Sequence, residues 1–307
     1  MSGVAALTGA SGFIGSRVLA RLQADGWQVR ALSRSPPAAS SSRVTWVAGD
    51  LSQEGIAAEL VSGVDTVVHC AGTVSGASEA HFLRANTEAT RRLVEAAARQ
   101  GTRPRLMVLS SLAARYPALS PYARSKRLAE DAVTTHAGDM PWTILRPTAV
   151  YGPGDKALAP LLRMLARGWL PVPGQWAARV TLLHVDDLVN AIAVGLSTPV
   201  APWGCFELDD GTDGGYSWWG IAAAGEQAFE RRVRFLPVPA SGLYAAASVN
   251  QALARVLGYT PMLTPGKVRE LRHDDWRCNY RPYRELTGWW PRLGLADALL
   301  QGRLGIE

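Results

Sequence analysis

VAALTGASGFIG, residues 4–15, is a short apolar run that leads directly into three glycines spaced three residues apart. The apolar run predicts a strand, and the apolar spacing of residues 16–23 predicts a helix behind it. Gly9 allows the tight turn, Gly12 lets the backbone approach a bound group, and Gly15 allows close packing of helix on strand. Because the first N–H groups of a helix are unpaired and partly positive, this loop is expected to bind the pyrophosphate of a dinucleotide.

The first half of the chain alternates short apolar runs with helical stretches. Further strands are expected at residues 27–32, 44–48, 66–69, 106–109 and 142–145, with helices at residues 53–61, 79–99 and 122–135. Strands that alternate with helices of this length pair in parallel through right-handed crossovers. The predicted fold class is therefore α/β, a doubly wound parallel Rossmann sheet with a smaller C-terminal α/β substrate lobe.

After Pro147 the pattern changes, because Pro, Gly and Trp become frequent. Strands are expected at residues 180–183 and 233–236, with helices at residues 158–167, 186–196 and 243–257. We divide the chain into a Rossmann NAD(P)-binding domain, residues 1–150, and a mainly substrate-binding lobe, residues 151–307. A later segment, about residues 178–200, is expected to return to the first domain. In such sheets ligands bind at the carboxyl ends of the strands.

The composition limits the location and the partners of the protein. Of 307 residues 48% are hydrophobic and 19% charged, and the net charge is +6. No apolar run approaches the roughly 20 residues of a membrane span, and no signal peptide is evident, so we expect a cytoplasmic protein without a membrane partner. The arginines are dispersed, which argues against nucleic acid. Cys70, Cys205 and Cys278 have no metal or disulfide spacing. We therefore expect no metal site, and we expect the three thiols to be buried and reduced.

Further motifs follow the glycine loop in a fixed order. They are Gly49-Asp50-Leu51, His69-Cys70-Ala71-Gly72, Asn86, Ser110-Ser111, Tyr122 with Lys126, Arg146-Pro147, Tyr151-Gly152-Pro153-Gly154-Asp155 and His184-Val185-Asp186-Asp187. Together with the Thr-Gly-x-x-Gly-x-x-Gly spacing, this series resembles the short-chain dehydrogenase/reductase superfamily, in its extended, epimerase/dehydratase-like branch. The resemblance is close up to Asp187 and loose beyond it.

Tyr122 and Lys126 are four residues apart, so they share one face of the predicted helix. A phenol is a poor base at neutral pH, and a nearby ammonium lowers its pKa. The resemblance implies that Tyr122 exchanges a proton with the substrate oxygen, while Lys126 tunes Tyr122 and holds the nicotinamide ribose. It also implies a serine that hydrogen-bonds the substrate oxygen. Ser111 is our choice for this catalytic hydroxyl, and Ser110 remains the alternative.

The second predicted strand ends in Ser33-Arg34, without the carboxylate that would select NAD. Because an arginine there can pair with a 2′-phosphate, NADP(H) is favoured and NAD(H) remains possible. The resemblance places Asp50 near the adenine. The residues expected to bind the cofactor are Gly9, Ser11, Gly12, Phe13, Ile14, Gly15, Arg34, Asp50, Leu51, Ala71, Gly72, Thr73, Tyr122, Lys126, Pro147 and Val150.

These features favour an NADP(H)-dependent oxidoreductase that transfers a hydride between nicotinamide and a small carbonyl or alcohol substrate. Relatives that dehydrate sugar nucleotides carry two acidic residues after the hydroxyl residue, whereas Leu112 and Ala113 stand here, so dehydration is disfavoured. One alternative is an NAD(P)-dependent sugar-nucleotide epimerase. Another is a non-catalytic nucleotide-binding or redox-sensing subunit. The resemblance also implies a homodimer formed through residues 79–99 and 122–135.

Three further expectations concern residues outside the motifs for proton transfer. Asn86 resembles a family asparagine that steadies the active-site backbone. His184 is expected to fix a turn beside an aspartate N-cap. For the tryptophans at 169, 176, 218 and 219 we expect core positions, with an apolar or stacking pocket as the alternative.

Overall fold

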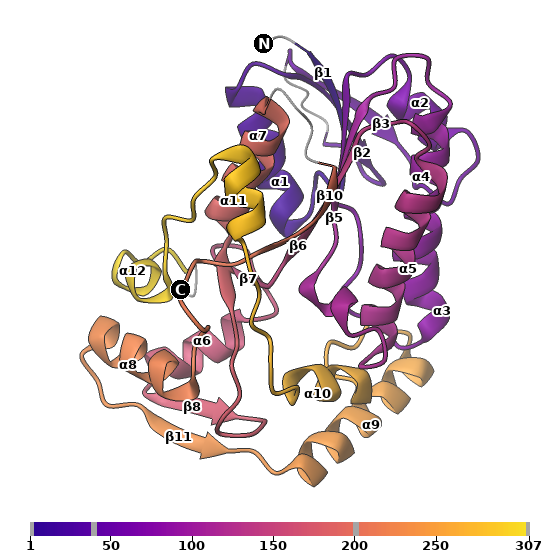
Figure 1. The fold of residues 1–307 in the computed structure, drawn as a ribbon. Coiled ribbons are helices and arrows are strands. Elements are labelled where there is room, and N and C mark those ends of the chain that lie inside the picture. The colour runs from indigo at the N-terminus through magenta and orange to yellow at the C-terminus, as the bar shows by residue number, and fades with distance from the viewer. Residues whose placement is uncertain (1–2, 38–41, 199–202, 305–307) are drawn as a thin grey trace.

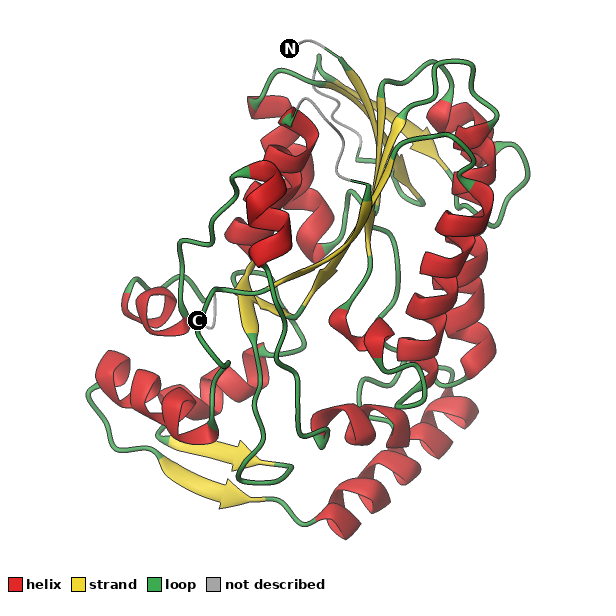
Figure 2. Ribbon diagram, in the orientation of Figure 1, coloured by secondary structure: helices red, strands yellow, loops and turns green. Residues whose placement is uncertain are grey.

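The structure, a computed structural model, describes residues 3–37, 42–198 and 203–304. Its centre is a parallel seven-stranded sheet in the order β3-β2-β1-β4-β5-β6-β10 (Figures 1 and 2). The strands are β1 (Val4–Thr8), β2 (Gln28–Ser33), β3 (Val44–Ala48), β4 (Thr66–His69), β5 (Arg105–Leu109), β6 (Trp142–Pro147) and β10 (Gly204–Leu208). The predicted doubly wound Rossmann sheet is therefore confirmed.

Helices cover both faces of this sheet. One face packs against α1 (Phe13–Ala24), α7 (Val185–Ser197) and α11 (Arg281–Thr287). The other face packs against α2 (Ile56–Val61), α4 (Ala89–Ala98) and α5 (Pro121–His136). Successive side chains of β1 point to opposite faces of the sheet. Ala5 and Leu7 enter the core on the α1 side, and Ala6 enters the core on the α2 side.

A smaller group of elements lies beyond the carboxyl ends of the strands. Its strands form two parallel pairs, β7 (Ala149–Tyr151) with β9 (Leu182–His184) and β8 (Trp169–Val172) with β11 (Arg234–Pro237). Its helices are α6 (Ala159–Ala166), α8 (Trp218–Phe229), α9 (Ala240–Leu257), α10 (Pro265–Leu271) and α12 (Leu295–Leu300). Among the helices of the described residues, none is both long and apolar enough to cross a membrane.

The helix predicted over residues 79–99 is divided into three parts. A short α3 (Glu79–Phe82) leads into a π-helical turn, η1 (Leu83–Glu88), and then into α4. Asn86 and Thr87, which are adjacent in this turn, both hydrogen-bond Ser125 on α5. A π turn widens the helix locally, which lets two neighbouring side chains reach the same partner helix.

Three expectations about side chains need correction. Cys205 is exposed on the edge strand β10, and Cys70 and Cys278 are only partly buried. Of the four tryptophans expected in the core, Trp218 is buried, but the side chains at 169, 176 and 219 are exposed. The cap of α7 is His184 itself, whose buried ring accepts a hydrogen bond from the Asp186 amide, so no aspartate caps this helix.

Candidate active site

The glycine loop between β1 and α1 leaves no room for side chains at two of its three glycines. Gly9 has φ +71°, and a Cβ there would lie 2.8 Å from the amide nitrogen of Ala71. A Cβ on Gly15 would collide with the carbonyl oxygen of Gly9. Gly12 is exposed and begins α1, and no side chain caps this helix end. The loop therefore fits a bound pyrophosphate, since the first N–H groups of α1, around Ser11, Phe13 and Ile14, remain available to it.

The carboxyl ends of β2 and β3 bring Arg34 and Asp50 near each other. Arg34 is exposed just beyond β2. Hydrogen bonds from Ser52 hold the pKa of Asp50 below its usual value, and the positive charge of Arg34 adds to this effect. Leu51, in contrast, is buried in the core, so its side chain is not available to a ligand. The structure thus brings Arg34 and Asp50, but not the Leu51 side chain, to this edge of the sheet.

The segment after β4 lies against α5. A Cβ on Gly72 would lie 2.9 Å from the Asn86 side-chain oxygen and 3.1 Å from Nζ of Lys126. The amide of Thr73 donates to Asn86 Oδ1 at 2.8 Å. Ala71, Gly72 and Thr73 therefore form a narrow wall beside Lys126, where a larger residue than glycine at position 72 would clash.

Lys126 lies on α5 with its ammonium group inside the protein. Its Nζ donates a hydrogen bond to the carbonyl oxygen of Leu109 at 3.0 Å. Burial lowers the pKa of Lys126 to about 8, although the charges of Glu130 and Cys70 oppose this shift. The ammonium is thus held at the end of β5, one turn along the helix from Tyr122.

Tyr122 lies at the first turn of α5, where Ser120 caps the helix and accepts from the Ala123 amide. Its ring contacts the ring of Phe82, with 6.1 Å between the ring centroids. Burial raises the pKa of Tyr122 to about 12, and a hydrogen bond with Ser111 only partly offsets that shift. The lowering of this pKa by Lys126 stays a prediction, since burial is the largest effect on Tyr122 here. Tyr122 is a protonated phenol at neutral pH.

The two candidate serines have different partners. Ser111 hydrogen-bonds the Tyr122 side chain and accepts from the Ala113 amide at 3.2 Å. Ser110 is buried and donates to Glu130 at 2.5 Å. Glu130 in turn receives two hydrogen bonds from Arg146, at 2.8 and 2.6 Å. The geometry therefore brings Ser111 to Tyr122, while Ser110 belongs to a buried ion pair.

Beyond β6, Arg146 turns toward Glu130, and the two cofactor candidates Pro147 and Val150 follow it. Pro147 is buried at the end of β6 and Val150 is partly buried in β7. Both lie at the carboxyl edge of the sheet, on the side where β7 leads into the smaller group of elements.

A series of buried hydrogen bonds links the start of the glycine loop to α5. Thr8 contacts Nδ1 of His69 at 2.7 Å, and Nε2 of His69 contacts Thr90 at 2.9 Å. Thr90 donates to the carbonyl oxygen of Asn86, whose side chain contacts Ser125 on α5. Sequence reasoning did not identify this series of hydrogen bonds. The available signal was the position of Thr8 and His69 at the ends of strands that pair in the sheet.

His69 is expected to make the protein less stable in mild acid. It is 1% exposed, and burial lowers its pKa from 6.5 to about 3, with a smaller effect from the Lys126 charge. Because the folded pKa is lower than the unfolded one, only the unfolded chain takes up this proton between those values. The contribution of neutral His69 is therefore complete above pH 6.5 and is lost as the pH falls, by about 2 kcal/mol between pH 7 and pH 5.

Urea unfolding of the protein and of His69→Gln at pH 7 and pH 5 measures this effect. We expect the free energy of unfolding to fall less between the two pH values in the variant, by about 2 kcal/mol. Equal losses in both proteins would contradict the buried, neutral histidine.

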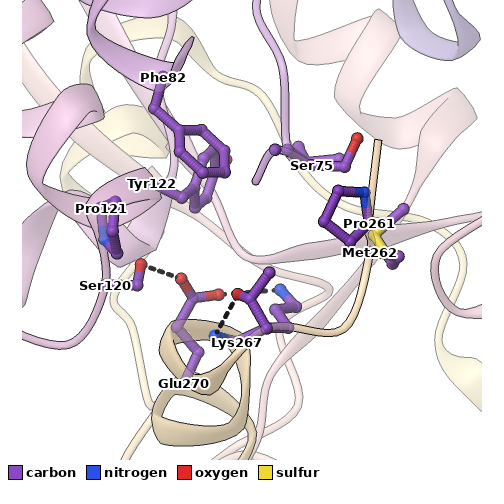
Figure 3. Close-up of a pocket in the computed structure, with 12 residues that line it drawn as sticks. Ser75, Phe82, Ser120, Pro121, Tyr122, Pro261, Met262, Lys267 and Glu270 are labelled. Carbon is purple, nitrogen blue, oxygen red and sulfur yellow. Dashed lines mark hydrogen bonds and ion pairs between the residues drawn. The ribbon is translucent and has the colours of Figure 1, made fainter. Parts of the chain in front are cut away.

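Figure 3 shows a cavity beside Tyr122. Its lining residues come from three segments, and they are Val74, Ser75, Gly76, Phe82, Ser120, Pro121, Tyr122, Pro261, Met262, Thr264, Lys267 and Glu270. Lys267 pairs with Glu270 at 2.8 Å, and Glu270 also accepts a hydrogen bond from Ser120. The cavity therefore brings Tyr122 together with several apolar side chains and one neutralised ion pair.

Residues 5–202 match the NAD dependent epimerase/dehydratase family. A ceramide reductase from Caulobacter vibrioides is 36% identical over 299 residues, which cover 96% of this chain and 92% of that protein. A 2-alkyl-3-oxoalkanoate reductase from Stenotrophomonas maltophilia is 29% identical, over 60% of this chain and 62% of that protein.

Solved structures of similar shape are also known. MoeE5 in complex with UDP-glucuronic acid and NAD matches with a TM-score of 0.74 and 23% identity, over 97% of this chain and 96% of that one. The UDP-glucuronic acid 4-epimerase from Bacillus cereus, with UDP-glucuronic acid and NAD, matches with a TM-score of 0.73 and 17% identity, over the same shares. At these identities the likeness shows a common fold.

Proposed function

Because the chain belongs to the NAD-dependent epimerase/dehydratase family, we propose that it is an NADP(H)-dependent reductase of a ketone in a ceramide-like, long-chain lipid. The family and the relatives make it an NAD(P)-dependent oxidoreductase or epimerase of the extended short-chain dehydrogenase/reductase type. The direction of the reaction, the class of substrate and the preferred nicotinamide are our proposals.

The proposed reaction adds a hydride to the carbonyl carbon and a proton to the carbonyl oxygen, which yields a secondary alcohol. A bound nicotinamide dinucleotide supplies the hydride. Tyr122 donates the proton, and its raised pKa of about 12 keeps it in the protonated form that reduction requires. Ser111 orients the carbonyl oxygen beside the phenol. Lys126 binds the ribose next to Gly72 and provides a positive charge at the end of β5.

The observation that carries the substrate proposal is the wall of the cavity beside Tyr122. Phe82, Pro121 and Met262 line it with apolar surface, which suits an acyl chain better than a sugar diphosphate. Among the described residues that line it, Lys267 is the single basic one, and Glu270 neutralises its charge. The similarity to a ceramide reductase and to a reductase of 2-alkyl-3-oxoalkanoates supports the same class of substrate.

The amount of NADPH oxidised in the presence of each candidate substrate tests this proposal directly. A long-chain 3-keto amide in mixed micelles is expected to be consumed together with NADPH in equal amounts. UDP-glucose and UDP-glucuronic acid, tested in the same way, are expected to give no oxidation of NADPH and no epimer. Turnover of a UDP-sugar but not of the lipid would replace the proposal by the sugar-nucleotide epimerase.

Arg34 is expected to select NADPH through its 2′-phosphate. In Arg34→Ala the Kd for NADPH should rise about 10- to 100-fold, because a charge-assisted pair of hydrogen bonds is lost, while the Kd for NADH should change little. Arg99→Ala is the matched control, since Arg99 is an exposed arginine on the far part of α4. Calorimetric titration of the three proteins with both nucleotides gives these constants. A wild-type preference for NADH would remove the role assigned to Arg34.

We retain two further proposals about organisation. Residues 1–150, with a returning segment of about residues 178–200, form the nucleotide-binding part, and residues 151–307 otherwise form mainly the substrate-binding part. This division is supported by the way in which α7 packs on α1 and β10 pairs with β6. A homodimer through α4 and α5, in the cytoplasm, is the proposed assembly.

A further inference from the structure

The helix α9 presents an uncharged, apolar face to solvent. Val249, Ala252, Leu253, Val256 and Leu257 recur at helical spacing and are all exposed, with Val256 at 83% and Leu257 at 69%. On the opposite face the small side chains of Ala247 and Ala254 are buried. A surface helix ordinarily places its apolar stripe against the core, so this arrangement leaves a second apolar stripe without a partner in the chain.

Exposed aromatic side chains lie at the same end of the molecule. Figure 1 shows β11 running directly into α9 along this end, with β8 beside β11. Trp169 of β8 is 41% exposed and lies under the guanidinium of Arg234. Trp176 and Trp219 stack on each other and are 45% and 61% exposed. Tryptophan and arginine together are typical of the boundary between a membrane and water.

The segment that contains β11 and α9 carries charges of one sign. From position 231 to position 269 the sequence contains five arginines and one lysine, and no aspartate or glutamate. Arg231, Arg232 and Arg234 stand before α9, and Arg255 lies on it. A second copy of the chain would bring like charges together at this face. An anionic lipid surface, in contrast, would be attracted to it.

The segment that follows α9 contributes to the cavity of the candidate active site. The segment after α9 carries Pro261 and Met262, which line the cavity, and Met262 is 38% exposed at its mouth. Gln251 of α9 donates to the carbonyl oxygen of Ala77, next to the cavity wall at Gly76. The segment after α9 thus reaches the cavity beside Tyr122, while the apolar face of α9 is exposed to solvent.

We propose that this end of the protein docks on the surface of an anionic lipid bilayer, with the apolar face of α9 and the exposed tryptophans inserted at the headgroup level. Docking of this kind needs no spanning helix, but it departs from the expectation of a protein without a membrane partner. The bilayer then delivers a long-chain ketone past Met262 to Tyr122, a second step that rests on the proposed function.

Sedimentation with vesicles tests the docking without cofactor or substrate. Vesicles of phosphatidylcholine, with or without phosphatidylglycerol, are mixed with the wild type and with Leu253→Gln/Val256→Gln/Leu257→Gln. The matched control is Leu286→Gln/Leu300→Gln, which replaces leucines of similar exposure on α11 and α12. Wild type and control are expected to bind the anionic vesicles, and the triple variant about 100-fold more weakly. Binding should also weaken as salt is added.

Three results would overturn the docking. The first is that the wild type does not bind the anionic vesicles, and the second is that the triple variant binds them as well as the wild type. The third is a wild-type dimer in sedimentation equilibrium that dissociates in the triple variant, since this face would then join two copies.

Activity on a short, water-soluble 3-keto amide tests the proposed function independently of the docking, because this substrate is not delivered by a bilayer. The triple variant should reduce it at the wild-type rate while it loses activity on the lipid in vesicles. If the wild type binds vesicles but reduces no ketone, the proposed function fails and the docking stands.

Discussion

Tyr122→Phe is expected to lower kcat for ketone reduction by about 10²- to 10⁴-fold, the usual contribution of a positioned proton donor. The substitution removes only the hydroxyl, so the ring contact with Phe82 is retained. The substitution leaves the glycine loop and Lys126 unchanged. The Kd for NADPH should therefore stay within about twofold of the wild-type value, and the loss should appear in kcat rather than in binding.

Ser111→Ala and Ser110→Ala provide a matched pair for the same step. Ser111 hydrogen-bonds Tyr122, so its loss should lower kcat, whereas Ser110 contacts Glu130 and its loss should reduce stability while kcat is kept. Steady-state rates and melting temperatures of the two variants distinguish these effects. Full turnover in Tyr122→Phe would show that another group donates the proton.

Arg146→Met is expected to destabilise the fold by about 3–5 kcal/mol, the usual cost of breaking a buried ion pair from one side. Arg146 makes two hydrogen bonds to Glu130, a residue that is only 4% exposed. Without the guanidinium, the Glu130 carboxylate would keep Ser110 as its hydrogen-bond partner but would lose its counter-ion. Urea unfolding at pH 7 measures the free energy of the variant.

The double variant Glu130→Met/Arg146→Met controls for this interpretation. It removes both charges, so it should recover a large part of the lost stability. A double variant that is less stable than Arg146→Met would contradict a penalty from the unpaired carboxylate. Glu130 also opposes the lowering of the Lys126 pKa, so the double variant is expected to have a lower pKa at Lys126 than the wild type.

The sheet could be predicted from the sequence to a large extent, because its strands are short apolar runs separated by helices. The first six strands of the central sheet follow from that pattern alone. β10 could not be identified in this way, since Gly204 begins it at φ +148° and Glu207 interrupts its apolar residues. This segment becomes a strand because it pairs with β6. The residue pattern within a short stretch of sequence carries no information about that pairing.

The candidate site likewise has a part that local sequence patterns predict and a part that they do not. The glycine loop and the pair Tyr122 and Lys126 are local patterns, so their spacing alone brings them together. The contacts of Ser110 with Glu130 and of Thr8 with His69 join distant parts of the chain, and only the fold reveals them. The sign of the Tyr122 pKa shift could not be predicted, because it depends on burial by neighbours from several elements.

The surface of the C-terminal part was the least predictable region. Trp169, Trp176 and Trp219 are apolar residues in a chain with a large core, so burial was the natural expectation. In the structure the core beneath them is already filled by Leu170, Trp218 and their neighbours, and the three rings remain on the surface. Sequence composition cannot indicate which of several aromatic residues a core has room for.

The most direct test of the central claim follows the hydride itself. NADPH carrying deuterium at the transferable position of C4 is mixed with the wild-type protein and a long-chain 3-keto amide, and the products are analysed by mass spectrometry. A reductase with Tyr122 as proton donor predicts a secondary alcohol with one deuterium on the carbinol carbon, and one NADP⁺ released for each alcohol formed. Deuterium that stays with the nucleotide, or a substrate that changes configuration without net oxidation of NADPH, would contradict the account.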